Sequence, residues 1–300
     1  MNMSPPVSPA LPPSVTDVAE GKIFALGPSI EARRCHAWIA ADVSGWMPFQ
    51  CYVLRDAGQL VMLDGGFPVM RDAVHEGLQA LVPGTRQRRF MMTRRELDTI
   101  LNLPWIAHDF AFDSAHCGGD LSPIDFFEKI DDVSIDAQIK ALMDAPFSFV
   151  KPGEIYEIGS LRLEMIRASL MVLPTFWFYE STTRTLFTSD CFGIVPQASP
   201  RDPRVSRPRD SEISAERVRA FLNVKFDWLR GIDNRPLAKD LEKVFSDRPV
   251  DRICPNLGCI IEGRDAIDRV LSQTLVALAE MAKEPWRSVL TDWNYHPTPA

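Results

Sequence analysis

The chain alternates twice between groups of short β-strand patterns and groups of amphipathic helix patterns. The strand patterns gather at residues 22–63 and again at residues 147–188. Helical spacing of apolar residues follows each group, at residues 69–81, 96–106, 125–144, 212–229, 237–245 and 265–282. These parts bury most apolar surface when two sheets pack together and helices cover their outer faces. We therefore predict an α/β (α+β) protein with four layers, an αββα sandwich.

The two ends of the chain differ from this central part. Five of the first thirteen residues are proline, and prolines lack amide donors and favour polyproline II. We expect residues 1–20 to be a disordered proline-rich arm, residues 21–284 to form one domain, and residues 285–300 to be a C-terminal tail.

Composition excludes several classes of function. The 300 residues carry a net charge of -7, which argues against nucleic acid as a partner because a phosphate backbone attracts basic surfaces. No apolar run reaches the roughly 18 residues that span a bilayer, so we expect no membrane insertion. The first residues lack a secretory signal, and the six cysteines form no CxxC pair. Both features favour a cytoplasmic protein with reduced thiols.

Four segments place a carboxylate or a glycine directly after an apolar strand pattern. They are VMLDGG (61–66), FMMTRRELDT (90–99), TLFTSDCFG (185–193) and ICPNLGCIIEG (253–263). Each segment alone is ordinary turn chemistry. In this order and at these separations they resemble the metallo-β-lactamase superfamily, and within it the flavodiiron and oxygen-binding di-iron proteins, whose metal loop reads THxExDH.

The resemblance implies a metallo-β-lactamase-like fold with a metal site where strand-end loops meet between the two sheets. The positions of the family's histidine ligands hold Arg94, Thr99, Val172 and Leu257. Arginine has no lone pair to give, and valine and leucine cannot coordinate a metal. We therefore predict a degenerate site without a metal or other cofactor. Zinc or iron held by unusual ligands is the alternative.

Carboxylates of such a site remain in the sequence, at Glu96, Asp98 and Asp190, with Asp64 nearby. Each close carboxylate pair would repel by about 4 kcal/mol at 4 Å and an effective dielectric of 20. Arg94 could neutralise part of this charge through bidentate contacts. We predict that Arg94, Glu96, Asp98 and Asp190 lie in one cleft and form the catalytic group.

Aromatic and apolar side chains are predicted to line a ligand pocket above Arg94. The candidates for substrate binding are Trp46, Phe67, Trp105, Trp177, Thr99, Val172 and Leu257. A pocket with one cation and aromatic walls suits a small aromatic or carboxylated molecule.

Three functions remain open at this point. The first is a pocket that binds or transforms a small organic molecule without a metal. The second is a metal-dependent hydrolase or di-iron protein with unusual ligands, for which His36 is the best placed histidine. The third is a non-catalytic scaffold or a subunit of a homo-oligomer. Whether the protein is an enzyme stays open, and an enzyme would be hydrolase-like without the usual di-metal centre.

Overall fold

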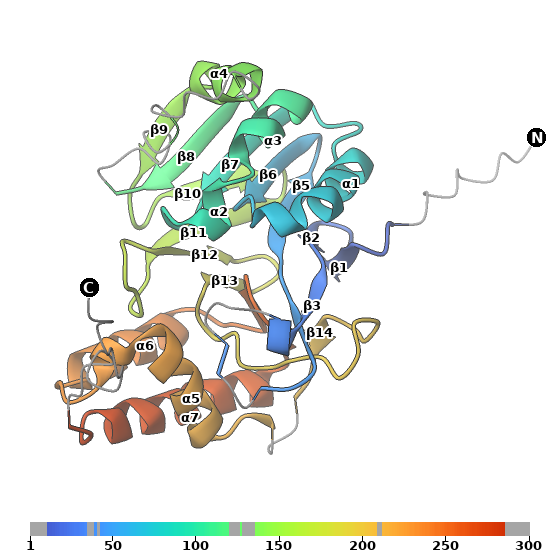
Figure 1. Ribbon diagram of the computed structural model, residues 1–300. Helices are drawn as coiled ribbons and strands as arrows, with labels where there is room; N and C mark the ends of the chain where they lie inside the picture. Colours follow the sequence, from blue (N-terminus) through green and yellow to red (C-terminus); the bar gives the residue numbers. More distant parts are fainter. Residues whose placement is uncertain are drawn as a thin grey trace, which may run out of the picture.

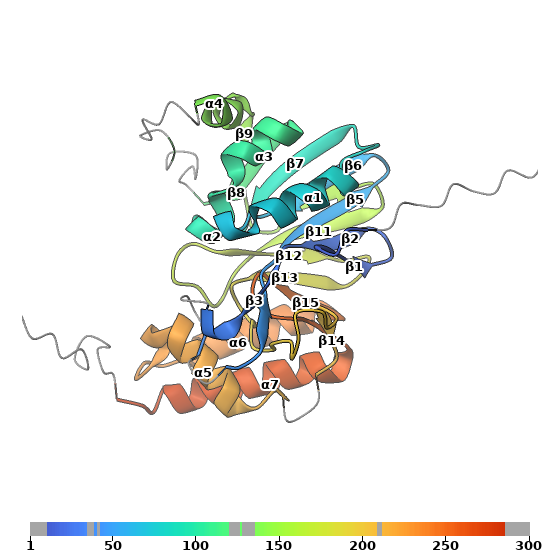
Figure 2. The ribbon, with the colours of Figure 1, turned by 45° about the vertical axis from the view of Figure 1, so that its right-hand side comes forward.

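The computed structural model describes residues 11–34, 39–40, 43–119, 127, 136–208 and 212–285. Figure 1 shows two stacked sheets with helices on both outer sides, so that α1, α3 and α4 cover the first sheet and α5, α6 and α7 cover the second. Figure 2, turned by 45°, shows the same order of layers. The predicted αββα sandwich is confirmed.

The first sheet has seven strands in the order β1-β2-β5-β6-β7-β8-β9. Their bounds are β1 Val15–Ala19, β2 Ile23–Leu26, β5 Cys51–Asp56, β6 Gln59–Leu63, β7 Gln87–Met92, β8 Ser114–Gly118 and β9 Phe147–Val150. The strands from β1 to β6 pair antiparallel, whereas those from β6 to β9 pair parallel. The parallel strands therefore end at the same edge of the sheet.

The second sheet also has seven strands, in the order β10-β11-β12-β13-β15-β16-β14. Their bounds are β10 Ile155–Ile158, β11 Leu161–Arg167, β12 Phe176–Glu180, β13 Thr185–Ser189, β15 Arg252–Pro255, β16 Ile260–Glu262 and β14 Val205–Ser206. β13 and β15 are parallel neighbours, so they too end at one edge. A separate antiparallel pair is formed by β3 (Ser29–Glu31) and β4 (Trp46–Pro48).

Seven α-helices and three short 3-10 helices lie in the part of the chain described. The α-helices are α1 Arg71–Leu81, α2 Leu97–Ile100, α3 Leu103–Phe110, α4 Asp136–Asp144, α5 Ala215–Lys225, α6 Arg235–Asp247 and α7 Arg264–Met281. The 3-10 helices are η1 Ala32–Arg34, η2 Pro68–Met70 and η6 Asp227–Leu229. Among these helices, none is both long and apolar enough to cross a membrane.

Alternation along the strands divides the apolar side chains among three cores. In β6, Leu60 and Met62 pack against the helices of the first sheet, whereas Val61 and Leu63 face the second sheet. This is the period of two expected of a strand that is buried on both faces. A third core lies between the second sheet and helices α5 to α7. Each sheet is thus covered on both sides, as the four layers require.

Several boundaries differ from the prediction, and the predicted helix at 212–229 is α5 followed by η6. Strand β1 lies within the predicted disordered arm, because the last proline of the arm is Pro13 and the following Val15–Ala19 pairs with β2. The predicted helix at 96–106 is two helices, since α2 ends at Ile100 and Pro104 lies in the first turn of α3. Residues 1–10, most of the predicted helix before residue 136, and the tail from residue 286 lie outside the described residues. The first sheet thus begins before residue 21, while the predicted end of the domain at residue 284 stays a prediction.

Candidate functional site

Four strands bring polar residues to the same edge of the sandwich. Asp64 follows β6 and Thr93 follows β7, and these two strands are parallel neighbours in the first sheet. Asp190 follows β13 and Asn256 follows β15, which are parallel neighbours in the second sheet. The four sequence segments that carried the resemblance therefore meet at one place.

Asp64 connects the strand ends of both sheets. Its Oδ1 accepts a hydrogen bond from the Thr93 amide at 2.7 Å, and its Oδ2 accepts from Thr93 Oγ1 and from Asn256 Nδ2, both at 2.7 Å. Desolvation by burial raises the pKa of Asp64 from 3.8 to about 6, although the Thr93 and Asn256 hydrogen bonds oppose the rise. Asp64 is thus an internal anchor of the site and has no accessible surface for a ligand.

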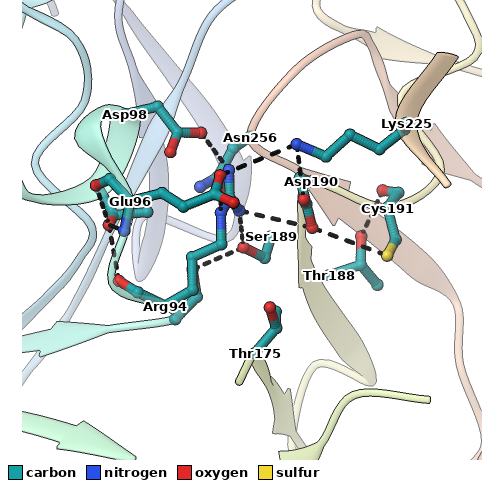
Figure 3. Close-up of polar contacts among 12 residues, drawn as sticks. Arg94, Glu96, Asp98, Thr175, Thr188, Ser189, Asp190, Cys191, Lys225 and Asn256 are labelled. Carbon is teal, nitrogen blue, oxygen red and sulfur yellow. Dashed lines mark hydrogen bonds and ion pairs between the residues drawn. The ribbon is translucent and has the colours of Figure 1, made fainter. Parts of the chain in front are cut away.

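Arg94 is the centre of the site, and only 1% of its side chain is exposed. Its Nε donates to Glu96 Oε2 at 2.9 Å, and its two terminal nitrogens donate to Asp98 Oδ2 and to Ser189 Oγ. The nitrogen that bonds Ser189 also lies 3.5 Å from Asp190 Oδ1. Figure 3 shows the three carboxylates around the one guanidinium. The structure therefore brings together all four residues of the predicted catalytic group, whose catalytic role stays a prediction.

The loop that carries Arg94 is fixed by its own backbone and by the second sheet. Thr99 Oγ1 donates to the carbonyl oxygens of Arg94 at 2.7 Å and Glu96 at 2.8 Å. Arg94 also forms an isolated bridge with Thr175, and the amide of Phe176 donates to Thr93 O at 2.7 Å. Thr99 is fully buried in this role. We predicted that Thr99 binds substrate, but it does not line the pocket described below.

Lys225 is a second buried cation of the site, which the sequence analysis did not identify. Its Nζ lies 2.8 Å from Asp190 Oδ2 and 3.9 Å from Glu96 Oε2. Lys225 ends α5, whose other buried residues are Val218, Phe221 and Leu222. Lys225 follows Leu222 by three residues and Phe221 by four, so it lies on the apolar face of the helix. This position of a lysine is the feature of the sequence that could have identified it.

Electrostatic interactions couple these groups strongly. Burial raises the pKa of Asp98, and the nearby charges of Glu96 and Asp190 add to the rise, while Arg94 opposes it. Burial alone would lower the pKa of Arg94, but the surrounding carboxylates, Asp98 first, raise it above its ordinary value. Arg94 therefore stays protonated at every accessible pH and acts as a fixed positive charge.

A small pocket opens beside this cluster, with a volume of about 20 Å³. Three charged residues of the site, Asp98, Asp190 and Lys225, form part of its wall. The remaining lining residues are Phe49, Gln50, Phe67, Met70, Asn256 and Leu257. Phe67 and Leu257 are thus at the pocket as predicted, whereas Gln50 and Asn256 were not identified from the sequence.

The other predicted substrate-binding residues lie elsewhere. Trp177 is fully buried against Phe192 in the core beneath the second sheet. Trp105 packs in the core of the first sheet, and Val172 is 57% exposed on the loop before β12. Trp46 pairs with Gln197 through its backbone. Strand β12 is buried along its whole length, with aromatic residues on both of its faces, so its apolar pattern does not mark which face Trp177 takes.

None of the three described histidines lines the pocket. His75 packs against Trp105, His108 bonds Asp109, and His116 lies between the hydroxyls of Ser114 and Ser148. His36, the best candidate for a rebuilt metal site, and His296 lie outside the described residues.

The fold has the metallo-β-lactamase-like architecture that is found in flavodiiron proteins. Rubredoxin oxygen:oxidoreductase from Desulfovibrio gigas is similar with a TM-score of 0.66 and 16% identity, over 88% of this chain and 61% of that chain. A diflavin flavoprotein fragment from Nostoc sp. has a TM-score of 0.64 and 14% identity, over 89% of this chain and 97% of the fragment. The flavodiiron protein from Giardia intestinalis has a TM-score of 0.57 and 16% identity, over 89% of this chain and 58% of that chain.

These similarities confirm the predicted resemblance to the flavodiiron branch at the level of the fold. The chain spans less than two thirds of the length of the Desulfovibrio and Giardia proteins. No family model matches the chain, and no curated protein matches its sequence.

The comparisons contradict our prediction that the protein has no cofactor. The similar structures are flavodiiron proteins, which are named for a flavin and a di-iron centre. The prediction is therefore not retained.

The side chains at the centre of the site do not fit a di-metal centre of the usual kind. In the described parts of the chain, no group of three or more histidine, cysteine, aspartate or glutamate side chains is arranged to hold a metal. Arg94 lies between Glu96, Asp98 and Asp190 and contacts all three carboxylates. A guanidinium cannot act as a metal ligand. The described side chains around Arg94 therefore offer no ligand set for such a centre.

Proposed function

We propose that this protein binds or transforms a small organic molecule in the pocket beside Arg94. The observation that carries the proposal is the buried guanidinium of Arg94, which contacts Glu96, Asp98 and Asp190 beside a pocket that two of these carboxylates line. Charged groups are expensive to bury, and they are therefore concentrated where a protein uses them. Apolar walls with a few convergent polar groups are typical of ligand sites.

The degenerate site is part of this proposal. Arg94 and Lys225 supply two positive charges among the carboxylates, and the hydrogen bonds and ion pairs around them hold these groups in place. Such a site can orient a ligand by hydrogen bonds and charge. If the protein is an enzyme, we propose hydrolase-like chemistry by acid–base groups such as Asp98.

Two further predictions belong here. We propose a cytoplasmic location, which is supported by five described cysteines that are free and buried. A homo-oligomer stays a prediction.

A ligand screen with two matched variants tests the proposal. Leu257→Trp adds a large side chain to the pocket wall, whereas Val172→Trp adds the same side chain at an exposed position outside it. We expect at least one class of small molecule to raise the melting temperature of the wild type and of Val172→Trp in a saturable way, but not that of Leu257→Trp. If every stabilising compound acts equally on all three proteins, the pocket is not the binding site.

A further inference from the structure

Two buried oxygen atoms at the pocket lack a hydrogen-bond partner among the described residues. They are Asp98 Oδ1 and Gln50 Oε1, and both residues line the pocket. Asp98 is 8% exposed and Gln50 is 1% exposed. A buried polar atom without a partner is costly, so unpaired atoms of this kind mark positions that a ligand can satisfy. Both atoms are acceptors, and they therefore require hydrogen-bond donors.

The rest of each side chain is already bound, which fixes the two oxygens in place. Gln50 Nε2 donates to the carbonyl oxygens of Pro255 and Gly258, both at 2.9 Å. Turning the amide over would break both hydrogen bonds. Asp98 Oδ2 accepts from Arg94, which leaves Oδ1 as the open oxygen of that carboxylate. Two unpaired acceptors are thus held in place in the residues that line the pocket.

The charges around the pocket favour a cation over an anion. The connected groups contain two cations, Arg94 and Lys225, and a larger number of carboxylates, Asp64, Glu96, Asp98 and Asp190. Lys225 directs its ammonium at Asp190, at 2.8 Å. When all these groups are ionised the site carries excess negative charge, which disfavours the carboxylated ligand that we expected from the sequence.

The apolar wall also suits a cation of small size. The rings of Phe49 and Phe67 both line the pocket, with their centroids 5.8 Å apart in an edge-to-face arrangement. Aromatic faces attract ammonium groups. The pocket volume of about 20 Å³ exceeds the roughly 10–15 Å³ that a water-sized group requires, and an ammonium group has this size.

We propose that the pocket binds the primary ammonium group of a small amine. Its N–H groups donate to Asp98 Oδ1 and Gln50 Oε1, and its apolar body lies against Phe67 and Leu257. The proposal rests on the proposed function and names the chemical class of its ligand.

Three probes of three carbon atoms each, with different polar groups, test the proposal. They are n-propylammonium chloride, 1-propanol and sodium propionate, each titrated at constant ionic strength and pH 7 against the full chain, with the melting temperature as readout. We expect saturable stabilisation by propylammonium alone. Asp98→Asn should weaken its apparent affinity at least tenfold, whereas Asp144→Asn, which removes an exposed carboxylate of α4, should leave it unchanged.

Each outcome decides the matter. If Asp98→Asn does not fold, Leu257→Trp replaces it, since blocking the pocket must also abolish propylammonium binding. Saturable binding of propanol or propionate that Leu257→Trp abolishes, without propylammonium binding, would overturn the ammonium proposal and leave the proposed function standing. If none of the three probes stabilises the protein, the ammonium proposal fails. If, in addition, Leu257→Trp abolishes the stabilisation by no compound of the wider screen, the proposed function fails as well.

Discussion

The hydroxyl of Ser189 lies 2.6 Å from Thr93 Oγ1 and joins the end of β13 to the end of β7. Thr93 Oγ1 donates to Asp64, so Ser189 must donate to Thr93, while Arg94 donates to Ser189. A continuous chain of hydrogen bonds therefore runs from the buried cation to the buried carboxylate of Asp64. This chain connects the two sheets at the centre of the site.

Removing this hydroxyl should destabilise the protein. Ser189→Ala leaves one nitrogen of Arg94 without its hydroxyl acceptor and Thr93 Oγ1 without a donor, at a cost of about 1–3 kcal/mol. Urea unfolding followed by circular dichroism measures the loss. The control is Ser246→Ala on the exposed side of α6, which should change stability by less than about 0.5 kcal/mol. Equal effects of the two substitutions would contradict the proposed hydrogen-bond chain.

The raised pKa of Asp64 predicts a pH dependence of stability. Its pKa rises from 3.8 in the exposed chain to about 6 in the folded protein, so the folded state binds more protons between these values and loses stability as pH rises through them. The loss is about 3 kcal/mol. Asp64→Asn cannot ionise and lacks this loss. The difference in unfolding free energy, wild type minus variant, should therefore be larger at pH 4 than at pH 7, and a constant difference would show that Asp64 does not titrate in this range.

Lys225, the last residue of α5, should contribute to the stability of the protein. Lys225→Met keeps the apolar stem of the side chain but removes the charge from Asp190 and Glu96, which lie 2.8 Å and 3.9 Å from its Nζ. We expect the unfolding free energy, measured in urea at pH 7, to fall by about 2–3 kcal/mol. Lys243→Met on α6, where Lys243 is 74% exposed and lies 3.4 Å from Asp247, is the matched control and should lose less than about 0.5 kcal/mol. Similar losses in both variants would remove Lys225 from the site.

Patterns of apolar residues along the chain predicted the layers, whereas the resemblance to a known family predicted the meeting point of the four loops. Alternating apolar residues identify strands, and a turn after a parallel strand must lie at a sheet edge. Lys225 was not found because its partners, Asp190 and Glu96, are distant in sequence. Trp177 was placed at the pocket in error, because β12 is buried on both faces and its sequence does not distinguish them.

The central claim is that Arg94 is the fixed cation that holds the carboxylates together, and Arg94→Met tests it most directly. Without the guanidinium, the pKa of Asp98, which burial already raises, rises further. A carboxyl group with a raised folded-state pKa binds protons that the unfolded chain releases, so stability falls as pH rises above about 4. We expect Arg94→Met to lower the unfolding free energy by about 3–5 kcal/mol at pH 8. At pH 5 this loss should be smaller by at least about 1.4 kcal/mol, which corresponds to a shift of one pKa unit.

The measurement is the unfolding free energy in urea of wild type, Arg94→Met and Arg264→Met at pH 5 and pH 8. Arg264 is 58% exposed and pairs with Asp268 at 3.2 Å on the surface of α7, so its removal should cost less than about 1 kcal/mol at both pH values. The account predicts a large loss for Arg94→Met that grows from pH 5 to pH 8. A loss for Arg94→Met that equals that of Arg264→Met, or that does not change with pH, would contradict it.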